Sequence, residues 1–330
     1  MRPGRFGRYA IRTADGVQEA AYLPIGGIEQ YIRVRGRSRA NPVLLVLHGG
    51  PGSTLGATAC RWQGALEAAF TVVHWDQRGS GNTYYRDPAA PPPTVERRLS
   101  DLDELVYALW ARYGRDRLFL LGHSWGSLLG GLYALRRPEK LSAWLPVSQM
   151  VDFKRSEQVS AAEAIRRARG AGREDAERLA QELEQVLALR RLDRAGAGAL
   201  LRFRRRKERY LPPQYGGPSP LGGLAAPELT GNDLRWKLCF DRILAANAAL
   251  YEELLGGLSL DGCPPRYGVP VILTAGERDW TTPYPLAAAY YDTLSAPCKA
   301  FLSLPDAGHL PFRERPEEWS HILLDALAQI

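Results

Sequence analysis

The feature that most constrains this chain is a Gly-x-Ser-x-Gly sequence at residues 122–126, placed between an apolar run and a helical segment. Residues 118–121 read Leu-Phe-Leu-Leu, and residues 127–135 have helical character. A strand, this turn and a helix in succession predict a nucleophile elbow centred on Ser124. We expect glycines on either side because the turn is too tight for side chains and places the serine in a strained backbone geometry.

Apolar runs alternate with amphipathic segments along most of the chain. We expect strands at residues 42–47, 70–75, 118–121, 141–147, 269–275 and 299–304, after a hairpin over residues 19–35 with its turn at Gly26 and Gly27. Helices are expected at residues 99–113, 125–135, 284–294 and 316–330. This alternation predicts an α/β fold, a mostly parallel sheet with helices on both faces.

The alternation stops between about residues 152 and 262, where no strand pattern is found. Helical patterns lie near residues 157–169, 173–192, 199–210 and 232–255, and the Pro/Gly-rich residues 211–223 predict an irregular loop. Because strands resume afterwards, we expect one core (residues 1–150 and 263–330) with an inserted helical cap (residues 151–262). A cap at this point would cover the carboxyl ends of the strands.

Composition and charge limit the classes of protein to consider. Of the 330 residues, 45% are hydrophobic and 24% are charged, which is ordinary for a globular protein. The net charge of +7 does not predict nucleic-acid binding, because the basic residues are spread widely among acidic ones. Residues 161–210 are the exception, with fourteen Lys or Arg against eight Asp or Glu. This run predicts a solvated helix face or, alternatively, a surface for an anionic substrate or partner.

The sequence predicts neither membrane insertion nor export. No stretch approaches the roughly 20 apolar residues of a membrane span, and no apolar segment follows the basic N-terminal residues. The four cysteines (Cys60, Cys239, Cys263 and Cys298) are too far apart for a metal knuckle or a redox pair, so we expect buried, reduced thiols. We therefore expect a cytoplasmic protein.

A serine nucleophile needs a base, and His309 is the best-placed histidine. It follows the expected strand at residues 299–304, in a loop that would open on the same sheet edge as Ser124. The other four histidines are placed less well: His48 in a glycine turn, His74 inside a strand, His123 within the elbow and His321 in the last helix.

The base needs an acid to orient it, and we assign Asp279. It lies in the loop after the strand at residues 269–275, and in a fold of this kind the chain order is serine, acid, histidine. Asp306 and Glu277 are alternative acids in nearby positions. Ser124, His309 and Asp279 form the expected triad.

Two further glycine-rich loops follow expected strands. Residues 48–52 read His-Gly-Gly-Pro-Gly, which predicts an oxyanion hole made by the backbone N–H groups of Gly50 and Trp125. A plain tight turn is the alternative. Residues 76–81 read Asp-Gln-Arg-Gly-Ser-Gly, and we expect an internal ion pair of Asp76 or Arg78 to brace the floor of the site.

Taken together, five motifs resemble the proline iminopeptidase (prolyl aminopeptidase) group of α/β hydrolases, a family of serine peptidases. They lie at residues 48–52, 76–81, 122–127, 276–279 and 308–309. The resemblance covers about residues 20–150 and 265–330. It implies an α/β-hydrolase fold with a helical cap and a serine hydrolase able to release an N-terminal residue, such as proline, from peptides.

The cap departs from that group. Its members that accept a free amine hold it with cap carboxylates near a helix rich in Trp and Glu, and residues 235–241 here lack that pattern. A helix with a solvated face is the alternative interpretation of this region. If the amine site exists, the candidate residues are Asp233, Asp241, Glu252 and Glu253.

The sequence therefore predicts a hydrolase that cleaves an amide or ester bond through an acyl-enzyme on Ser124. The substrate would be a small peptide or a small ester or amide, and no metal or organic cofactor is required. Prolyl-aminopeptidase-like release of an N-terminal residue is the first hypothesis. The second is an esterase, lactonase or thioesterase for a small, anionic metabolite. A pocket that only binds is a third, which the ordered Ser, Asp and His disfavour. Core motifs do not set the substrate.

Overall fold

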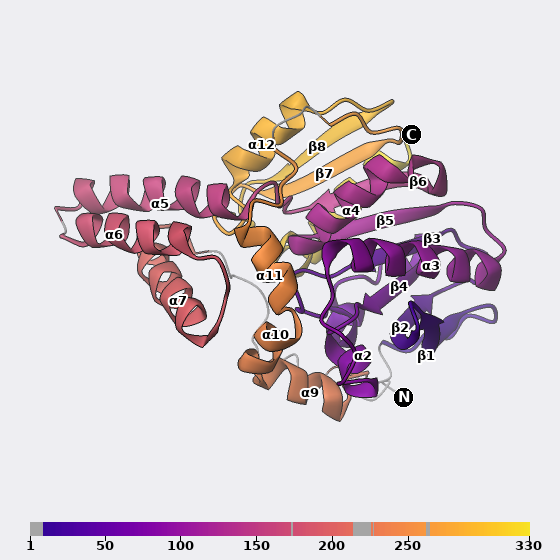
Figure 1. The fold of residues 1–330 in the computed structure, drawn as a ribbon. Helices are drawn as coiled ribbons and strands as arrows, with labels where there is room; N and C mark the ends of the chain where they lie inside the picture. The colour runs from indigo at the N-terminus through magenta and orange to yellow at the C-terminus, as the bar shows by residue number, and fades with distance from the viewer. Residues whose placement is uncertain (1–8, 173, 214–225, 227, 262–264) are drawn as a thin grey trace, which may run out of the picture.

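The computed structural model describes residues 9–172, 174–213, 226, 228–261 and 265–330. Its centre is an eight-stranded sheet with the order β1-β2-β4-β3-β5-β6-β7-β8 (Figure 1). The strands are β1 (Val17–Ile25), β2 (Ile28–Gly36), β3 (Val43–Leu47), β4 (Thr71–Asp76), β5 (Leu118–His123), β6 (Leu141–Val147), β7 (Val271–Gly276) and β8 (Lys299–Leu304). The predicted α/β fold is confirmed, and each expected strand lies within two residues of its predicted bounds.

Strand direction follows from how the strands are connected. β1 and β2 form the expected antiparallel hairpin, and β2 also pairs antiparallel with β4. The pairs from β4 through β3, β5, β6 and β7 to β8 are parallel. β3, β4 and β7 are buried along their whole length, as expected for strands that are covered on both faces of the sheet. Their carboxyl ends, and the loops that follow, meet at one edge of the sheet.

Helices cover both faces of the sheet and bury two apolar clusters. α3, α4 and α12 pack on one face, and α1, α13 and α14 on the other. α3 begins earlier than predicted because the Thr94 side chain caps it by accepting from the Arg97 N–H, and it ends at Gly114 with φ of 59°. The helices of this part are α1 (Leu66–Ala69), α2 (Gly81–Arg86), α3 (Val95–Tyr113), α4 (Trp125–Arg136), α12 (Tyr284–Thr293), α13 (Pro311–Glu314) and α14 (Pro316–Leu327), with short 3-10 helices η2 (Gly56–Arg61) and η3 (Pro138–Lys140).

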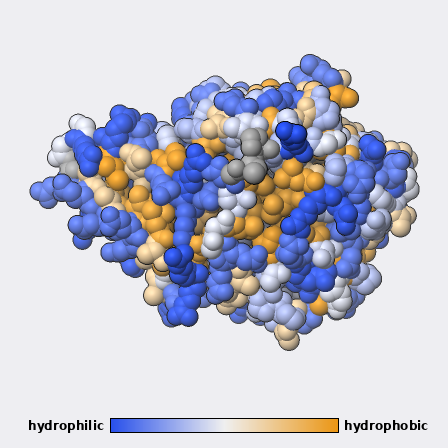
Figure 2. Space-filling view, turned by 45° about the horizontal axis from the view of Figure 1, so that its top comes forward, coloured by the Kyte–Doolittle hydropathy of each residue, from blue (hydrophilic) through white to orange (hydrophobic). Residues whose placement is uncertain are grey.

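Six described helices lie between β6 and β7, and we call them the cap helices. They are α5 (Phe153–Gly170), α6 (Asp175–Ala188), α7 (Arg194–Glu208), α9 (Gly231–Leu238), α10 (Phe240–Ala246) and α11 (Ala248–Leu255). In Figure 1, α5–α7 project from one side of the sheet, and α9–α11 run along the molecule beside α2 and α3. Figure 2 shows hydrophobic residues gathered where α5–α7 meet the rest of the molecule, with hydrophilic residues toward the edges.

One helix was expected over residues 232–255, and this prediction is wrong in detail, because three short helices occupy it. The breaks between these helices lie at Cys239 and Asn247, whose ψ angles of 70° and 17° are not helical. The buried Asn247 amide donates to the Gly79 carbonyl at 3.0 Å, so a tertiary contact with the core replaces a regular helical turn. The loop predicted at residues 211–223 lies largely outside the described residues.

Two further expectations concern membranes and cysteines. Within the described ranges, no helix combines the length and the apolar character needed to cross a membrane. Cys60 is a buried free thiol as expected, but Cys298 is exposed, so the prediction of buried thiols is wrong for that residue. It lies in the surface turn that leads into β8. Cys263 lies outside the described residues.

Candidate active site

Ser124 occupies the turn between β5 and α4, with backbone angles φ 55° and ψ −120°. This conformation is strained for a residue with a side chain. Its flanking glycines are a steric requirement. A Cβ atom on Gly122 would lie 2.3 Å from the Gly126 carbonyl oxygen, and one on Gly126 would lie 2.3 Å from the Leu47 carbonyl oxygen. The Gly-x-Ser-x-Gly pattern therefore lets β5, α4 and β3 approach closely around the serine.

Hydrogen bonds on both sides hold the strained turn. The Ser124 N–H donates to the Val147 carbonyl of β6 at 3.1 Å. The Ser124 carbonyl accepts from the Ser127 hydroxyl at 2.6 Å, and that hydroxyl in turn accepts from the Met150 N–H at 2.8 Å. The elbow is thus tied to β6 and to the segment that leads into the cap helices.

His309 and Asp279 come together at the same sheet edge. The His309 Nδ1 lies 2.9 Å from Asp279 Oδ2. Asp279 is 1% exposed and also accepts from the Thr281 N–H at 2.8 Å and from the Thr282 N–H and hydroxyl at 3.0 and 2.8 Å. Burial alone would raise the pKa of Asp279, but His309 and the Thr282 donors lower it. The carboxylate stays ionised and fixes the imidazole with its proton on Nδ1.

The alternative acids lie elsewhere. Asp306 is exposed and forms an ion pair with Arg278 at 2.5 Å. Glu277 is exposed and accepts a hydrogen bond from the Ser303 hydroxyl at 2.6 Å. Neither bonds to His309, so among the three carboxylates only Asp279 is in contact with the imidazole.

The backbone of His309 is held by two residues that sequence reasoning did not select. The His123 Nε2 donates to the His309 carbonyl at 2.8 Å, and the Ser148 hydroxyl donates to it at 3.0 Å. Burial, and then the proximity of His309, lower the pKa of His123 to about 3, which keeps its imidazole neutral. His123 occupies the variable position of the elbow, where a sequence pattern carries no signal of its role.

Ser124 and His309 line the same cavity, which has a volume of about 410 Å³. No hydrogen bond joins the Ser124 hydroxyl to the His309 ring, although such bonds are commonly long until a substrate is bound. The cavity lies between the core loops and the cap helices, and its lining residues are Gly49, Gly50, Gly52, Ser53, Thr54, Leu55, Thr58, His123, Ser124, Arg204, Trp236, Lys237, Ile243, Thr281, His309, Leu310 and Arg313.

Of the two residues expected to form an oxyanion hole, Gly50 lines this cavity and Trp125 directly follows Ser124, which also lines it. Gly50 lines it with φ of 112°, and Trp125 is the first residue of α4. Neither backbone N–H donates a hydrogen bond to another described residue. The first N–H groups of a helix have no partner inside it, so that of Trp125 is available to an oxygen of a substrate.

Gln77 ties the loop at residues 48–52 to the elbow. Its side-chain amide donates to the His48 carbonyl at 3.2 Å, and its carbonyl oxygen accepts from the Trp125 indole at 3.3 Å. The same oxygen accepts from the buried Arg98 guanidinium, which also donates to Asn247 Oδ1 at 2.6 Å. Burial lowers the pKa of Arg98 to about 9. One network thus joins the predicted oxyanion loop, α3 and the cap helices.

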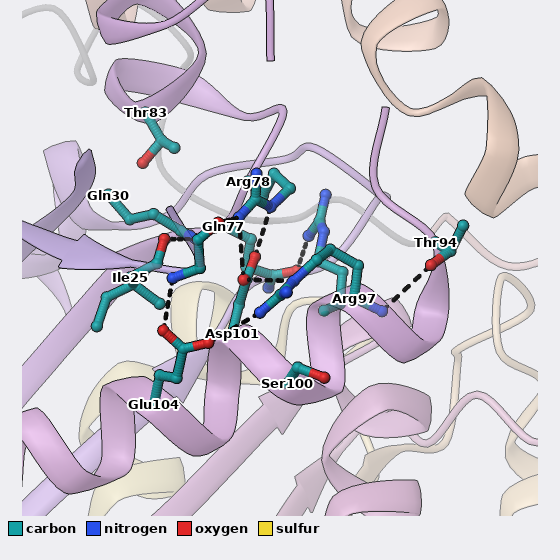
Figure 3. Close-up of polar contacts among 12 residues, drawn as sticks. Ile25, Gln30, Gln77, Arg78, Thr83, Thr94, Arg97, Ser100, Asp101 and Glu104 are labelled. Carbon is teal, nitrogen blue, oxygen red and sulfur yellow. Dashed lines mark hydrogen bonds and ion pairs between the residues drawn. The ribbon is translucent and has the colours of Figure 1, made fainter. Parts of the chain in front are cut away.

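The ion pair expected in residues 76–81 is confirmed for Arg78. Its guanidinium donates twice to Asp101, at 2.7 and 3.0 Å, and Asp101 is fully buried. Figure 3 shows Arg97 reaching the same carboxylate from the other side, at 2.9 Å. Arg78 also donates to the Gly26 carbonyl at 2.7 Å, so this pair anchors the loop to α3 and to the hairpin turn.

Asp233, the first candidate for amine recognition, is occupied by structural contacts. It is 2% exposed and pairs with Arg33 at 2.7 Å. It also accepts from Asn82 at 3.1 Å, and together with Thr230 it forms the capping box that begins α9. Asp233 does not line the cavity that contains Ser124.

The other three candidates also lie away from that cavity. Asp241 and Glu252 line a different cavity of about 330 Å³, together with Arg191 and Arg194. Glu253 accepts a hydrogen bond from the Val95 N–H at 2.9 Å and so caps the start of α3. The structure therefore does not bring the four carboxylates together around Ser124.

Metal-ligating side chains do not gather near this cavity or elsewhere in the described residues. In the part of the chain that the structure describes, no three His, Cys, Asp or Glu side chains are grouped as they would be around a metal ion.

The sheet order and the strand–elbow–helix unit are those of the α/β-hydrolase fold. The chain belongs to the alpha/beta hydrolase family, whose model matches residues 43–321. The family assignment and the fold predicted from the sequence are thereby confirmed.

Within this family, the chain is similar to proteins named as aminopeptidases and proline iminopeptidases. The chain is 27% identical over 313 residues to "Probable aminopeptidase YbaC" of Bacillus subtilis, covering 91% of this chain and 93% of that protein. It is 34% identical over 113 residues to a proline iminopeptidase of Lactobacillus delbrueckii subsp. lactis, covering 34% of this chain and 37% of that protein. A solved structure of a proline iminopeptidase-related protein from Thermus thermophilus is 26% identical, with a TM-score of 0.55 over 94% of this chain and 98% of that one. The predicted resemblance to the proline iminopeptidase group is confirmed.

Proposed function

We propose that this protein hydrolyses an amide or ester bond through an acyl-enzyme formed on Ser124. One observation carries the proposal: Ser124, in a strained turn at a helix N-terminus, shares a cavity with His309, whose Nδ1 lies 2.9 Å from the buried Asp279 carboxylate. A nucleophile, a base and a group that orients the base are the parts that acyl transfer needs.

The proposed reaction has two halves. His309 Nε2 takes the proton of the Ser124 hydroxyl while the oxygen attacks the substrate carbonyl, and the oxyanion that forms accepts from the N–H groups of Gly50 and Trp125. His309 then gives its proton to the leaving amine or alcohol. Water, activated by the same imidazole, releases the acid and restores Ser124. Asp279 keeps the Nδ1 proton in place and stabilises the imidazolium in both halves.

We assign the cap helices the task of covering this cavity. Arg204 of α7 and Trp236, Lys237 and Ile243 of α9 and α10 contribute to its wall. The Trp236 indole donates to the Gly52 carbonyl at 2.7 Å, which ties the cap directly to the loop at residues 48–52. Cap residues over the cavity would limit the access of water to Ser124 and strengthen the polar contacts there.

For the substrate, the first candidate is the N-terminal residue of a short peptide, as in the aminopeptidase relatives. Its support is the likeness of the chain over most of its length to "Probable aminopeptidase YbaC". The second candidate is an ester, lactone or thioester of a small anionic metabolite. Its support is the lining of the cavity, which holds three basic side chains and, among the described residues, no Asp or Glu.

Two measurements test the proposal. A fluorophosphonate should label wild type at Ser124, and Ser124→Ala should be unlabelled, folded, and lower in kcat by several orders of magnitude. Labelling at another residue, or near-normal turnover by the variant, would refute the acyl-enzyme. Initial rates on L-prolyl p-nitroanilide beside its N-acetyl form then separate the two substrates. Cleavage of the free amine alone supports the aminopeptidase, and cleavage of neither by a labelled enzyme supports the ester hydrolase.

A further inference from the structure

The cavity around Ser124 carries an unbalanced positive charge. Arg204, Lys237 and Arg313 line it, and no described lining residue is acidic. The residues outside the description (1–8, 173, 214–225, 227 and 262–264) include no Asp or Glu in the sequence. Arg204 pairs with Glu157 on the cap side, and Glu157 also pairs with Lys207, so this cluster keeps a positive charge of its own. Lys237 and Arg313 differ from Arg204 because neither forms an ion pair with a described carboxylate.

Arg313 lies on the core side, in α13, four residues after His309. It is half-buried, and its guanidinium forms no hydrogen bond or ion pair with another described residue. Withdrawal from water, and then the nearby charge of Arg61, lower the pKa of Arg313. A guanidinium offers five N–H donors in a planar fork that fits a carboxylate, and here that fork has no partner within the described chain.

Lys237 approaches from the cap side, on α9. It also lacks a hydrogen bond or ion pair with any described residue, although it lies near enough to Arg313 for the two charges to interact. The surrounding atoms lower the pKa of Lys237, Asp233 opposes this effect, and Arg313 adds to it. Two cations that line the same cavity repel each other, and an anion bound by both would turn that repulsion into attraction.

The lining of the cavity includes a further polar residue, Thr54. This residue is more than nine-tenths buried, and its hydroxyl oxygen has no hydrogen-bond partner in the described structure. A buried hydroxyl without a partner is costly unless a ligand completes it. Ser53 and Thr58 line the same cavity.

The backbone that carries Arg313 is fixed relative to His309. The Glu314 carboxylate accepts from the N–H groups of Gly308 and Leu310 at 2.6 and 3.0 Å, one on each side of His309. Because Glu314 holds this turn, a change of the Arg313 side chain alters the charge of the cavity without releasing the proposed base.

We infer that the substrate cleaved at Ser124 carries a carboxylate, which Arg313 and Lys237 bind together in the cavity, with the Thr54 hydroxyl as a further donor. This inference rests on the proposed acyl-enzyme function and names its substrate class. The carboxylate has two sources, the C-terminus of a short peptide on the leaving-group side or the far end of a dicarboxylic acyl group.

The test compares matched substrates that differ only in this charge. On the acyl side they are 4-nitrophenyl hydrogen adipate and 4-nitrophenyl hexanoate, and on the leaving-group side they are prolyl-alanine and prolyl-alanine amide. We expect wild type to prefer the carboxylate in one pair by about tenfold or more in kcat/KM, because charge-assisted hydrogen bonds are the stronger ones. The pair that shows the preference identifies the source of the carboxylate.

Two variants and two controls assign that preference to residues. In Arg313→Gln and Lys237→Gln, the ratio of kcat/KM for the charged and neutral substrates should fall about tenfold each. Arg235→Gln and Arg315→Gln remove a positive charge two residues away, from side chains that do not line the cavity, and should keep the wild-type ratio. Equal turnover of charged and neutral substrates by wild type, or a ratio unchanged in both cavity variants, would overturn the inference.

The outcome is separable from failure of the proposed function. If a fluorophosphonate does not label Ser124, the acyl-enzyme itself is refuted. If labelling occurs but none of the four substrates is cleaved, the rate of labelling is measured in the presence of adipate or adipamide. Protection by adipate alone, lost in Arg313→Gln, supports a carboxylate site, whereas equal protection or none overturns it.

Discussion

Replacing Asp279 with Asn tests the proposed triad through one atom. Asp279 Oδ1 accepts the N–H groups of Thr281 and Thr282, and the Oδ1 of an asparagine can continue to do so. The amide nitrogen would then replace Oδ2, which faces His309 Nδ1 at 2.9 Å and the Thr282 hydroxyl at 2.8 Å. An NH₂ group facing Nδ1 favours the tautomer that carries its proton on Nε2, and that tautomer cannot take the proton of Ser124.

The expected loss follows from that wrong tautomer. We expect kcat on 4-nitrophenyl hexanoate to fall about 10⁴-fold, equivalent to about 5.5 kcal/mol of barrier. The fold should be kept, because the two backbone donors to Oδ1 keep their acceptor. Urea unfolding followed by circular dichroism checks this point, and stopped assays with Ser124→Ala as the blank give the rate.

Asp306→Asn is the matched control, since it makes the same change in an exposed carboxylate that pairs only with Arg278. It should leave kcat within about twofold of wild type, as surface substitutions do. The reasoning fails if the Asp279→Asn enzyme keeps more than about a tenth of the wild-type kcat, which is the loss of only about 1.4 kcal/mol.

Three further predictions concern stability, each measured as the free energy of unfolding in urea. Gly126→Ala places a Cβ atom 2.3 Å from the Leu47 carbonyl and should cost about 3 kcal/mol; a change within about 0.5 kcal/mol would contradict the steric argument. Asp101→Asn leaves the buried Arg78 without its counter-charge and should cost about 3–5 kcal/mol, whereas a neutral effect would show that the pair is dispensable. Glu157 is buried, which alone would raise its pKa, but ion pairs with Arg204 and Lys207 lower it to about 2. Its contribution is therefore present above its ordinary pKa near 4.5 and lost as the pH falls toward 2, so wild type should lose more stability over that range than Glu157→Gln.

The fold and the elbow could be predicted because short-range physics determines them. The buried strands β3 and β7 are largely apolar runs. Glycine is required at residues 122 and 126 because backbone atoms lie less than 3 Å from where a side chain would begin. The loops that carry Asp279 and His309 follow strands directly, so the direction of the parallel strands brings them to one edge. Each inference needed only a strand and the few residues after it.

The bounds of the cap helices and the partners of their side chains could not be predicted as fully, because contacts with distant parts of the chain determine them. Residues 232–255 have one helical pattern. The helix is divided because Asn247 forms hydrogen bonds with Arg98 and Gly79, which lie 149 and 168 residues earlier in the chain. The sequence gives no indication of a partner for Asp233, but in the structure it forms an ion pair with Arg33 on β2. Nothing within a few residues of either position announces such a partner.

Of the two basic residues proposed to bind a carboxylate, one could be placed near the site from the local sequence and the other could not. Arg313 has a local signal, since it follows His309 by four residues, in the short helix α13 that comes directly after the loop carrying the proposed base. Lys237 has none: it faces the cavity because the capping box at Thr230 and Asp233 sets where α9 begins, and because the Trp236 indole reaches the Gly52 carbonyl. Asp233, which was expected to bind a substrate amine, instead caps the start of α9 and so fixes the helix that carries Lys237. A carboxylate expected to bind an amine thus supports a site whose own charge favours an anion.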